Sequence, residues 1–387
     1  MSAAPPDLVE RVRRRLAAEA CDPTADHVAR ALRAEPGVFG PDTVLAVVDQ
    51  VRRDTAGAGP LDPLLALDGV TDVLVNGPRA VHIDRGRGLE EVPSVRFADD
   101  AEVRRLAQRL AALAGRRLDD ASPWVDARLP DGTRLHAVLA PIAHPGTTIS
   151  LRVPARRTFS LDDLVAAGAL TPDAAAVLRQ VVEARLAFMV SGGTGTGKTT
   201  LLSALLAEVD RAERLVVVED AAELRPEHPH LVALEARPAN VEGHGRVALS
   251  DLVRQALRMR PDRVVVGEVR GTEVVDLLAA LNTGHEGGCG TIHANSAADV
   301  PARFEALALS AGLPRAATHA QLAAGLDAVV HLRRDRDGRR RVDHVGVFEP
   351  TPEGIVACRP ALTFGAETRP GPGHDRWRAV MERGGAS

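Results

Sequence analysis

The sequence predicts an α/β protein whose second half is a parallel sheet covered by helices. Three observations lead to this prediction. Residues 171–350 alternate apolar strand-like segments with helical ones, which is the pattern of a parallel α/β domain. A glycine-rich loop joins one such strand, residues 186–190, to a helix that begins near residue 200. Two further apolar strands, residues 215–218 and 263–267, each run into acidic residues, as expected at the carboxyl edge of such a sheet.

The remaining parts of the chain predict smaller domains. Residues 1–56 carry three segments of helical period separated by Asp-Pro and Pro-Gly breaks, which predicts a helical bundle. Residues 57–153 alternate short strand-like stretches with turns around one helix at 101–114, which predicts an α+β domain. Residues 154–170 are charged and predict a linker that serves as a hinge. Residues 351–387 contain four prolines and six glycines, so we expect a poorly ordered tail.

Composition limits the class of protein. With 45% apolar residues, the 387-residue chain can build two or three ordinary hydrophobic cores. Its three cysteines, Cys21, Cys289 and Cys358, are widely spaced, which argues against a disulfide framework and a four-cysteine zinc site. Because the first residues are charged and no apolar run reaches 18 residues, we expect neither a signal peptide nor a membrane span. A reducing cytoplasm fits this sequence best. A net charge of −4 gives no general attraction to nucleic acid.

The glycine-rich loop contains the only lysine of the chain. Residues 192–199 (GGTGTGKT) fit the phosphate-binding pattern G-x-x-x-x-G-K-S/T, and Lys198 is the one lysine among 48 lysines and arginines. In such a loop the backbone N–H groups and the helix N-terminus hold phosphates, the lysine neutralises their charge, and the next hydroxyl, here Thr199, binds Mg²⁺. We therefore expect ATP and Mg²⁺ as ligands and hydrolysis of ATP. The residues expected to bind the nucleotide are Gly192, Gly193, Thr194, Gly195, Thr196, Gly197, Lys198, Thr199 and Thr200.

Acidic and histidine residues follow at the ends of neighbouring strands. Glu219 and Glu268 come at the carboxyl ends of two apolar strands. A nucleotide site needs one acidic group for Mg²⁺, usually through water, and one that orients or deprotonates the attacking water. In residues 283–296, His285 and His293 flank a stretch with three glycines. A histidine at a strand end can sense or stabilise a γ-phosphate.

These motifs resemble the ATPases of type II and type IV secretion and pilus assembly. Three segments are similar to the acidic box, the Walker B region and the histidine box of that superfamily: residues 219–224 (EDAAEL), 257–270 (LRMRPDRVVVGEVR) and 283–296 (TGHEGGCGTIHANS). Four upstream segments resemble its CpaF/TadA branch, which powers Tad/Flp pilus assembly and related conjugal-type transfer: residues 59–65, 73–77, 131–134 and 149–152. The resemblance covers about residues 57–350.

The resemblance implies a fold, an assembly and site residues. It implies a RecA-like P-loop motor domain preceded by a PAS-like domain, and a ring hexamer in which the amino-terminal domain clamps nucleotide against the motor. Glu268 matches the catalytic glutamate and Glu219 an acidic-box residue that holds Mg²⁺, partly through water. His293 matches the histidine near the γ-phosphate. Arg134 and Arg152 match arginines that reach the phosphates from the amino-terminal domain. Zinc is not expected, since the four-cysteine module of many type II secretion ATPases is missing from the sequence.

We expect a cytoplasmic ring ATPase, a homohexamer held at the inner face of the cell membrane by membrane-platform proteins, that powers Tad/Flp-type pilus assembly or type II/IV-like secretion. Two alternatives remain open. A DNA-directed conjugal transfer motor would use the basic residues 333–341, a predicted hairpin that turns at Asp337 and Gly338, although direct nucleic-acid binding is not favoured. A nucleotide-dependent assembly switch without turnover is disfavoured because both Glu219 and Glu268 are present.

Overall fold

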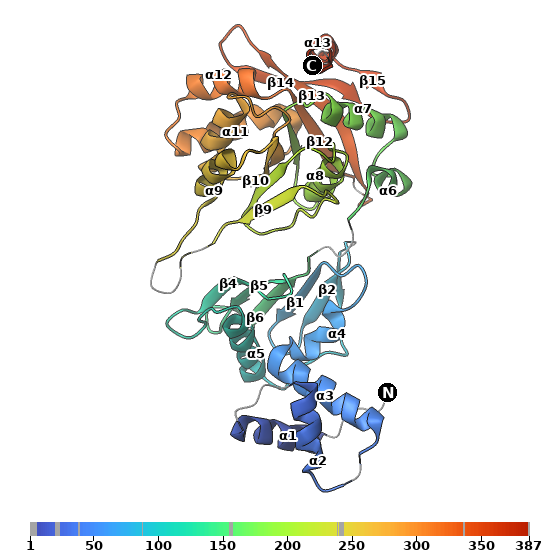
Figure 1. Ribbon diagram of the computed structural model, residues 1–387, viewed down its shortest axis with the longest axis vertical. Coiled ribbons are helices and arrows are strands. Elements are labelled where there is room, and N and C mark those ends of the chain that lie inside the picture. The colour runs from blue at the N-terminus through green and yellow to red at the C-terminus, as the bar shows by residue number, and fades with distance from the viewer. Residues whose placement is uncertain are drawn as a thin grey trace. The chain divides into compact units, whose positions relative to one another are not determined.

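The chain divides into two compact units, residues 1–155 and 156–387 (Figure 1). The computed structural model describes residues 6–19, 24–37, 39–86, 88–154, 158–237, 239, 244–335 and 337–385. Within these residues, each unit has two hydrophobic cores of its own.

The first unit opens with three helices, α1 (Pro6–Ala18), α2 (Ala25–Arg33) and α3 (Pro41–Ala56). Each of them contacts the other two. Val12 and Val28 are fully buried among them, and apolar residues of all three helices form one small core. The apolar periodicity of the sequence therefore builds the expected helical bundle.

The rest of the first unit is a six-stranded antiparallel sheet in the order β3-β2-β1-β6-β5-β4. Val73, Leu151 and Leu135 are direct neighbours across three strands and are fully buried. Alternate residues of these strands share a core with α5. The elements are η1 (Gly59–Leu61), α4 (Asp62–Leu65), β1 (Asp72–Asn76), β2 (Val81–Asp84), β3 (Leu89–Glu91), α5 (Asp100–Leu113), β4 (Trp124–Arg128), β5 (Arg134–Val138) and β6 (Thr148–Arg152).

The second unit is built on a nine-stranded sheet in the order β15-β14-β13-β12-β7-β11-β10-β8-β9. The six strands from β12 to β9 run parallel, and β13, β14 and β15 extend the sheet in antiparallel fashion. Helices α6, α7, α8 and α13 contribute to the core on one face of the sheet, and α9 to α12 to the core on the other. The expected fold class, a parallel P-loop sheet after a smaller α+β domain and a helical bundle, is confirmed.

The bounds of the second unit's elements are as follows. They are α6 (Leu161–Ala166), α7 (Pro172–Glu183), β7 (Phe188–Gly192), α8 (Lys198–Ala207), β8 (Leu215–Glu219), β9 (Leu231–Glu235), α9 (Leu249–Ala256), η2 (Leu257–Met259), β10 (Arg263–Val269), α10 (Glu273–Leu281), β11 (Cys289–His293), η3 (Ala297–Asp299), α11 (Val300–Ser310), α12 (Arg315–Gly325), β12 (Ala328–Arg334), β13 (Arg340–Pro350), β14 (Val356–Thr363), β15 (Arg369–Pro370) and α13 (His374–Gly384).

The prediction of a poorly ordered tail at 351–387 is wrong for the described residues, which end at 385. Strand β14 pairs with β13 over its length, and Trp377 of α13 is buried in the core. A glycine in this segment serves close packing, since a Cβ on Gly371 would lie 2.4 Å from the carbonyl oxygen of Pro360. Composition alone cannot distinguish glycines that permit close backbone contact from glycines that loosen a chain.

The predicted linker 154–170 belongs largely to the second unit. Residues 155–157, where the two units divide, lie outside the described residues. A capping box starts α6, because Ser160 Oγ accepts the Asp163 N–H and the Asp163 carboxylate accepts the Ser160 N–H, both at 3.0 Å. Leu161 is fully buried in the core. Asp162 and Asp163, two of the charges that suggested a linker, therefore belong to the first turn of α6.

Two predictions from composition concern the cysteines and the membrane. Cys289 and Cys358 are buried free thiols, and burial raises the pKa of each to about 12. Cys21 lies outside the described residues. Among the helices of the described segments, none has both the length and the apolar character needed to cross a bilayer.

Candidate nucleotide site

The loop between β7 and α8 takes backbone conformations that favour glycine. Gly192, Gly195 and Gly197 have φ angles of 153°, 71° and 94°. Gly192 is also required by packing, because a Cβ there would lie 2.6 Å from the carbonyl oxygen of Leu332 and 2.8 Å from Thr196 Oγ1. The glycines of the sequence motif therefore set the shape of the loop, and α8 begins immediately after it.

Lys198 lies over this loop. Its side chain is only 7% exposed, and Nζ donates hydrogen bonds to the carbonyl oxygens of Gly192 and Gly193 at 3.0 and 2.9 Å. Burial lowers the pKa of Lys198, while the carboxylate of Glu268 opposes that shift. An ammonium beside the N-terminus of a helix gives the site a positive charge that suits phosphate.

The residues fit a magnesium-bound nucleotide. Thr199 and Thr200 lie in the first turn of α8, directly after Lys198. The described part of the chain contains no group of three or more His, Cys, Asp or Glu side chains that could hold a metal by themselves. A hydroxyl with one or two carboxylates is the sparse protein ligand set that Mg²⁺ uses when phosphates and water complete its shell.

Three predicted site residues meet at the carboxyl edge of the sheet. His293 ends β11, and its Nε2 lies 2.8 Å from Oε1 of Glu268 on β10. Its Nδ1 lies 3.4 Å from Lys198 Nζ. Burial first, and then the Lys198 charge, lower the pKa of His293. Nε2 of His293 lies 3.5 Å from the same Nζ, so the ammonium faces both ring nitrogens. A neutral His293 can donate Nε2–H to Glu268, since a carboxylate only accepts. We name Lys198, His293 and Glu268 the motor triad.

Glu268 lies where the pairing of β10 with β11 is interrupted. Val266 pairs with Gly290 and Val269 with Ile292, so three residue steps on β10 match two on β11. Within this bulge Thr291 Oγ1 donates a 2.6 Å hydrogen bond to the carbonyl oxygen of Gly267. The bulge presents the Glu268 side chain, which is 36% exposed, to His293.

Glu219 lies one strand farther from the loop, at the end of β8. Its side chain is 4% exposed, and Oε1 accepts the N–H groups of Glu223 and Leu224 at 3.2 and 3.1 Å. Burial raises the pKa of Glu219 to about 7. A Cβ on Gly267 would lie 2.5 Å from Glu219 Cγ, so a glycine next to Glu268 is what admits this side chain. Glu219 thus packs against the strand of Glu268, and its hydrogen bonds go to the acidic segment rather than to the motor triad.

Arg270 links Glu268 to the acidic segment and was not predicted as a site residue. Its guanidinium lies 3.9 Å from Glu268 Oε2 and contacts the carboxylate of Asp220. Arg270 follows Glu268 by two positions, so the alternation of side chains along a strand could have placed both on one face. Asp220 could have been found as the second acidic residue after the strand that ends at Glu219.

His285 lies apart from the site. It precedes β11, whereas His293 ends the same five-residue strand, so the two histidines belong to opposite edges of the sheet. Nδ1 of His285 lies 3.3 Å from the carbonyl oxygen of Ala280 in α10. This contact is a structural one at the end of a helix.

Arg134 and Arg152 lie side by side within the first unit. They are direct partners across β5 and β6, so their side chains lie on the same face. Arg128 of β4 is the partner of Arg134 on its other side and is a candidate that the sequence did not single out. We name these three residues the arginine row. Only the strand register, which the sequence does not display, could have revealed Arg128.

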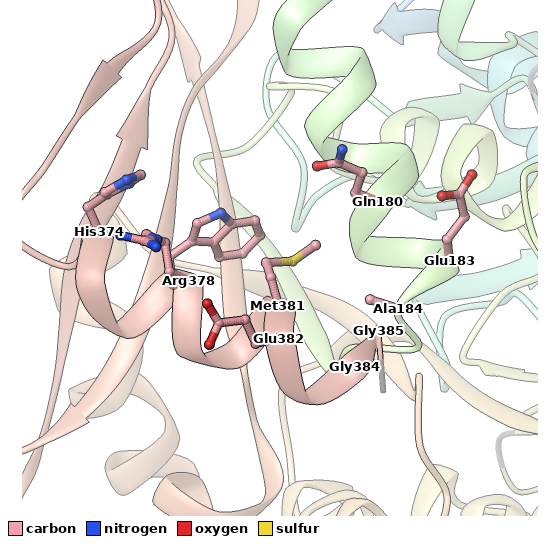
Figure 2. A pocket seen from close by; sticks show the side chains of 10 residues that line it. Gln180, Glu183, Ala184, His374, Arg378, Met381, Glu382, Gly384 and Gly385 are labelled. Carbon is pink, nitrogen blue, oxygen red and sulfur yellow. The ribbon is translucent and has the colours of Figure 1, made fainter. Parts of the chain in front are cut away.

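A hollow of about 630 Å³ lies elsewhere in the second unit, between α7 and α13 (Figure 2). Glu183 lines it from α7, and Trp377 and Met381 line it from α13. The end of α7 leads into β7 at the amino end of that strand, whereas the phosphate loop leaves its carboxyl end. The hollow therefore lies at the opposite edge of the sheet and is not part of the nucleotide site.

Residues 54–368 match the family described as type II/IV secretion system protein. This chain belongs to that family. The resemblance to the secretion ATPase superfamily, inferred from the motifs, is thereby confirmed.

Several known proteins are similar to this chain over most of its length. "Putative conjugal transfer protein Rv3659c" of Mycobacterium tuberculosis (strain ATCC 25618 / H37Rv) is 59% identical over 325 residues, which are 82% of this chain and 92% of that protein. "Probable conjugal transfer protein TrbB" of Sinorhizobium fredii (strain NBRC 101917 / NGR234) is 34% identical over 291 residues, 73% of this chain and 85% of that protein. The solved structure of the Yersinia pseudotuberculosis ATPase DotB shares the fold, with a TM-score of 0.54, 18% identity and coverage of 82% of both chains.

Proposed function

We propose that this chain is an ATP hydrolase that works as a homohexameric ring motor. It would power Tad/Flp-type pilus assembly or type II/IV-like secretion from the cytoplasmic side, attached to the inner face of the membrane through membrane-platform proteins. The observation that carries the proposal is the motor triad beside the phosphate loop. Family membership supports the secretion context.

Each of the site residues has a separate role in the proposed hydrolysis of ATP. The loop N–H groups and Lys198 hold the β- and γ-phosphates. Thr199 and Glu219 would hold Mg²⁺, partly through water, and the ion neutralises phosphate charge when bound. Glu268 orients and deprotonates the attacking water, because its carboxylate is partly exposed whereas that of Glu219 is buried. His293 keeps the Glu268 carboxylate in position through its 2.8 Å contact.

We infer that Arg134 and Arg152 supply further positive charge to the phosphates. Like charges placed directly opposite each other in a sheet are unfavourable unless an anion or a carboxylate balances them. Asp126 lies 4.0 Å from Arg134, and Asp72 of β1 is the direct partner of Arg152 on the side away from Arg134. The arginine row therefore suits the role of arginine fingers, which stabilise the charge of the transition state in phosphoryl transfer.

The deciding experiment is ATP hydrolysis by the purified chain across protein concentration, with molecular mass read in parallel and Lys198→Ala as control. Activity that rises with assembly to a hexamer and vanishes in the control supports the motor. ATP binding without turnover in any assembly state would favour the alternative of a nucleotide-dependent assembly switch.

A motor acting directly on DNA is less well supported. The names of the two relatives mention conjugal transfer. The described residues of the basic segment 333–341, which do not include Arg336, lie at the tip of a hairpin between β12 and β13. However, Arg333 and Arg341 lie 3.0 Å from the carboxylate of Asp335, which reduces the charge that the hairpin offers to a phosphate backbone. Salt-sensitive DNA binding that is lost when these arginines are neutralised would restore this alternative.

A further inference from the structure

The β12–β13 hairpin runs past the phosphate loop on the side away from Glu268. Strand β12 is parallel to β7, and Leu332 is the register partner of Gly192, where the loop begins. The Leu332 carbonyl oxygen lies so close to Gly192 that a Cβ would be 2.6 Å from it. Arg333 and Arg334 continue β12 beyond this point. The tip of the hairpin is therefore a neighbour of the loop within the same unit.

The two faces of the hairpin differ. Leu332 and its partner Val342 are buried in the core that includes α8. Since side chains alternate along a strand, Arg334 and its partner Arg340 continue that face toward the loop. Arg333 and its partner Arg341 point to the other face.

The charges are balanced on one face only. Arg333 pairs with Asp335 at 3.0 Å and with Asp343 at 3.1 Å, and Arg341 pairs with Asp335 at 3.0 Å. Arg339, at the turn, pairs with Asp337 at 3.4 Å. Within the part of the chain that the structure describes, Arg340 forms no ion pair. These ion pairs hold the hairpin in shape and leave two arginines, Arg334 and Arg340, on its α8 face. Arg334 Nε donates to the carbonyl oxygen of Gly338 at 3.4 Å, at the turn of the hairpin.

Arg340 lies against the last glycine of the loop. A Cβ on Gly197 would be 3.8 Å from Cδ of Arg340, which is ordinary contact distance. Gly197 directly precedes Lys198 and the N-terminus of α8. The Arg340 side chain is exposed, so its guanidinium is available beside the loop N–H groups.

We propose that Arg340 binds the diphosphate that ADP and ATP share; this rests on the proposed nucleotide binding. Strand β7 separates two sides of the site, with the strands of His293 and Glu268 on one and the hairpin on the other. A γ-phosphate held between Lys198 and Glu268 leaves the inner phosphates of the nucleotide on the hairpin side. A guanidinium is suited to two phosphate oxygens at once, and this planar fork distinguishes it from an ammonium.

The test is titration calorimetry with MgADP and with the magnesium complex of a non-hydrolysable ATP analogue. Arg340→Ala should raise both dissociation constants roughly tenfold, which is the effect of losing one charge-assisted hydrogen bond at an exposed site. Arg340→Lys should fall between Arg340→Ala and wild type. Arg339→Ala removes the same charge from the same hairpin, and its side chain is 83% exposed. It should change either constant by less than about twofold.

Several outcomes would overturn the assignment. Wild-type affinity of Arg340→Ala would do so, as would equal losses in Arg340→Ala and Arg339→Ala, which would indicate only a general positive field. A loss confined to the ATP analogue would move Arg340 to the γ-phosphate. Thermal unfolding without nucleotide identifies any folding defect in Arg340→Ala. If there is one, the comparison is made between Arg340→Lys and wild type instead. If wild type and Lys198→Ala both fail to bind nucleotide, the proposed function itself fails, whereas binding by wild type alone leaves the role of Arg340 to be decided by its own variants.

Discussion

The two units each contain a charged cluster, and the two clusters differ in the signs of the charges that lie side by side. The arginine row of the first unit places three like charges side by side across β4, β5 and β6. The motor triad of the second unit combines an ammonium, an imidazole and a carboxylate, so both signs of charge are present within it. Like charges repel in the first cluster, whereas in the second the Glu268 carboxylate attracts the Lys198 ammonium and lies 2.8 Å from His293 Nε2.

The difference indicates two tasks. A cluster balanced within itself fixes the positions of its members, which is what positioning a water molecule requires. Three arginines side by side, with Asp72 as the direct partner of Arg152 at the end of the row, favour an additional anion beside them. A charged phosphoryl group is such an anion. We therefore expect substitutions in the motor triad to affect the reacting groups directly and substitutions in the arginine row to affect chiefly the charge of the transition state.

The largest effect is expected for Glu268→Gln. An amide cannot take a proton from water, so turnover should fall by about 10³-fold, while the dissociation constant for ATP stays within about threefold of wild type. Steady-state hydrolysis and equilibrium binding measure the two quantities. Glu286→Gln, an exposed change at the other edge of the sheet, is the control. Near-normal hydrolysis by Glu268→Gln would remove Glu268 from the catalytic role.

A smaller loss is expected for Arg134→Ala. If the arginine row serves the transition state, hydrolysis should fall by about a hundredfold, with the affinity for nucleotide changed by less than about threefold. Arg96→Ala removes an exposed arginine of the same unit that donates to the carbonyl oxygen of Pro93, and it should hydrolyse ATP normally. Equal activity of the two variants would make Arg134 an ordinary surface residue.

The third prediction concerns pH and a buried histidine beneath the loop. His331 is 5% exposed, and its Nδ1 lies 2.9 Å from Ser191 Oγ. Burial, followed by the neighbouring His344, lowers its pKa to about 4. Because the folded pKa is below the unfolded value of about 6.5, this contribution to stability is complete above pH 6.5 and is lost as pH falls toward 4. At pH 5 the loss should be about 2 kcal/mol.

Urea unfolding at pH 7 and pH 5 measures this loss. His331→Gln cannot titrate, so its stability should fall less than that of wild type over the same interval, with the carboxylate titrations common to both proteins. A pH dependence identical in the two proteins would show that His331 is not held neutral by the fold.

The smallest effect is expected for Thr291→Val. The substitution removes the hydrogen bond to the Gly267 carbonyl within the bulge that presents Glu268, so the free energy of unfolding should fall by about 1 kcal/mol and turnover by a few-fold. Thr283→Val removes a hydroxyl that bonds to Ala279 in an exposed turn and is the control. Unchanged stability and turnover would show that the bulge holds without Thr291.

Features that depend on residues close together in the sequence were predicted best. The phosphate loop was found because its glycine, lysine and threonine spacing is local, and the hairpin at 333–341 because a turn signal lies between two apolar strands. The ordered tail was missed because its glycines are explained only by atoms far away in the sequence, such as the carbonyl oxygen of Pro360 against Gly371. Arg270 was overlooked although it follows Glu268 closely, since its partner Asp220 is 50 residues away along the chain.

Local patterns along the chain predict most of the elements and the kinds of side chain at their ends. Apolar period, glycine φ preference and capping depend on residues within a turn or two of each other, so they can be read along the chain. Which of these ends lie next to one another is known only from the folded arrangement. The 2.8 Å contact of His293 with Glu268, the register that places Arg128 beside Arg134, and the contact of Arg340 with Gly197 all depend on strand order and register. Those are set by the burial of whole sheet faces, which no local pattern contains.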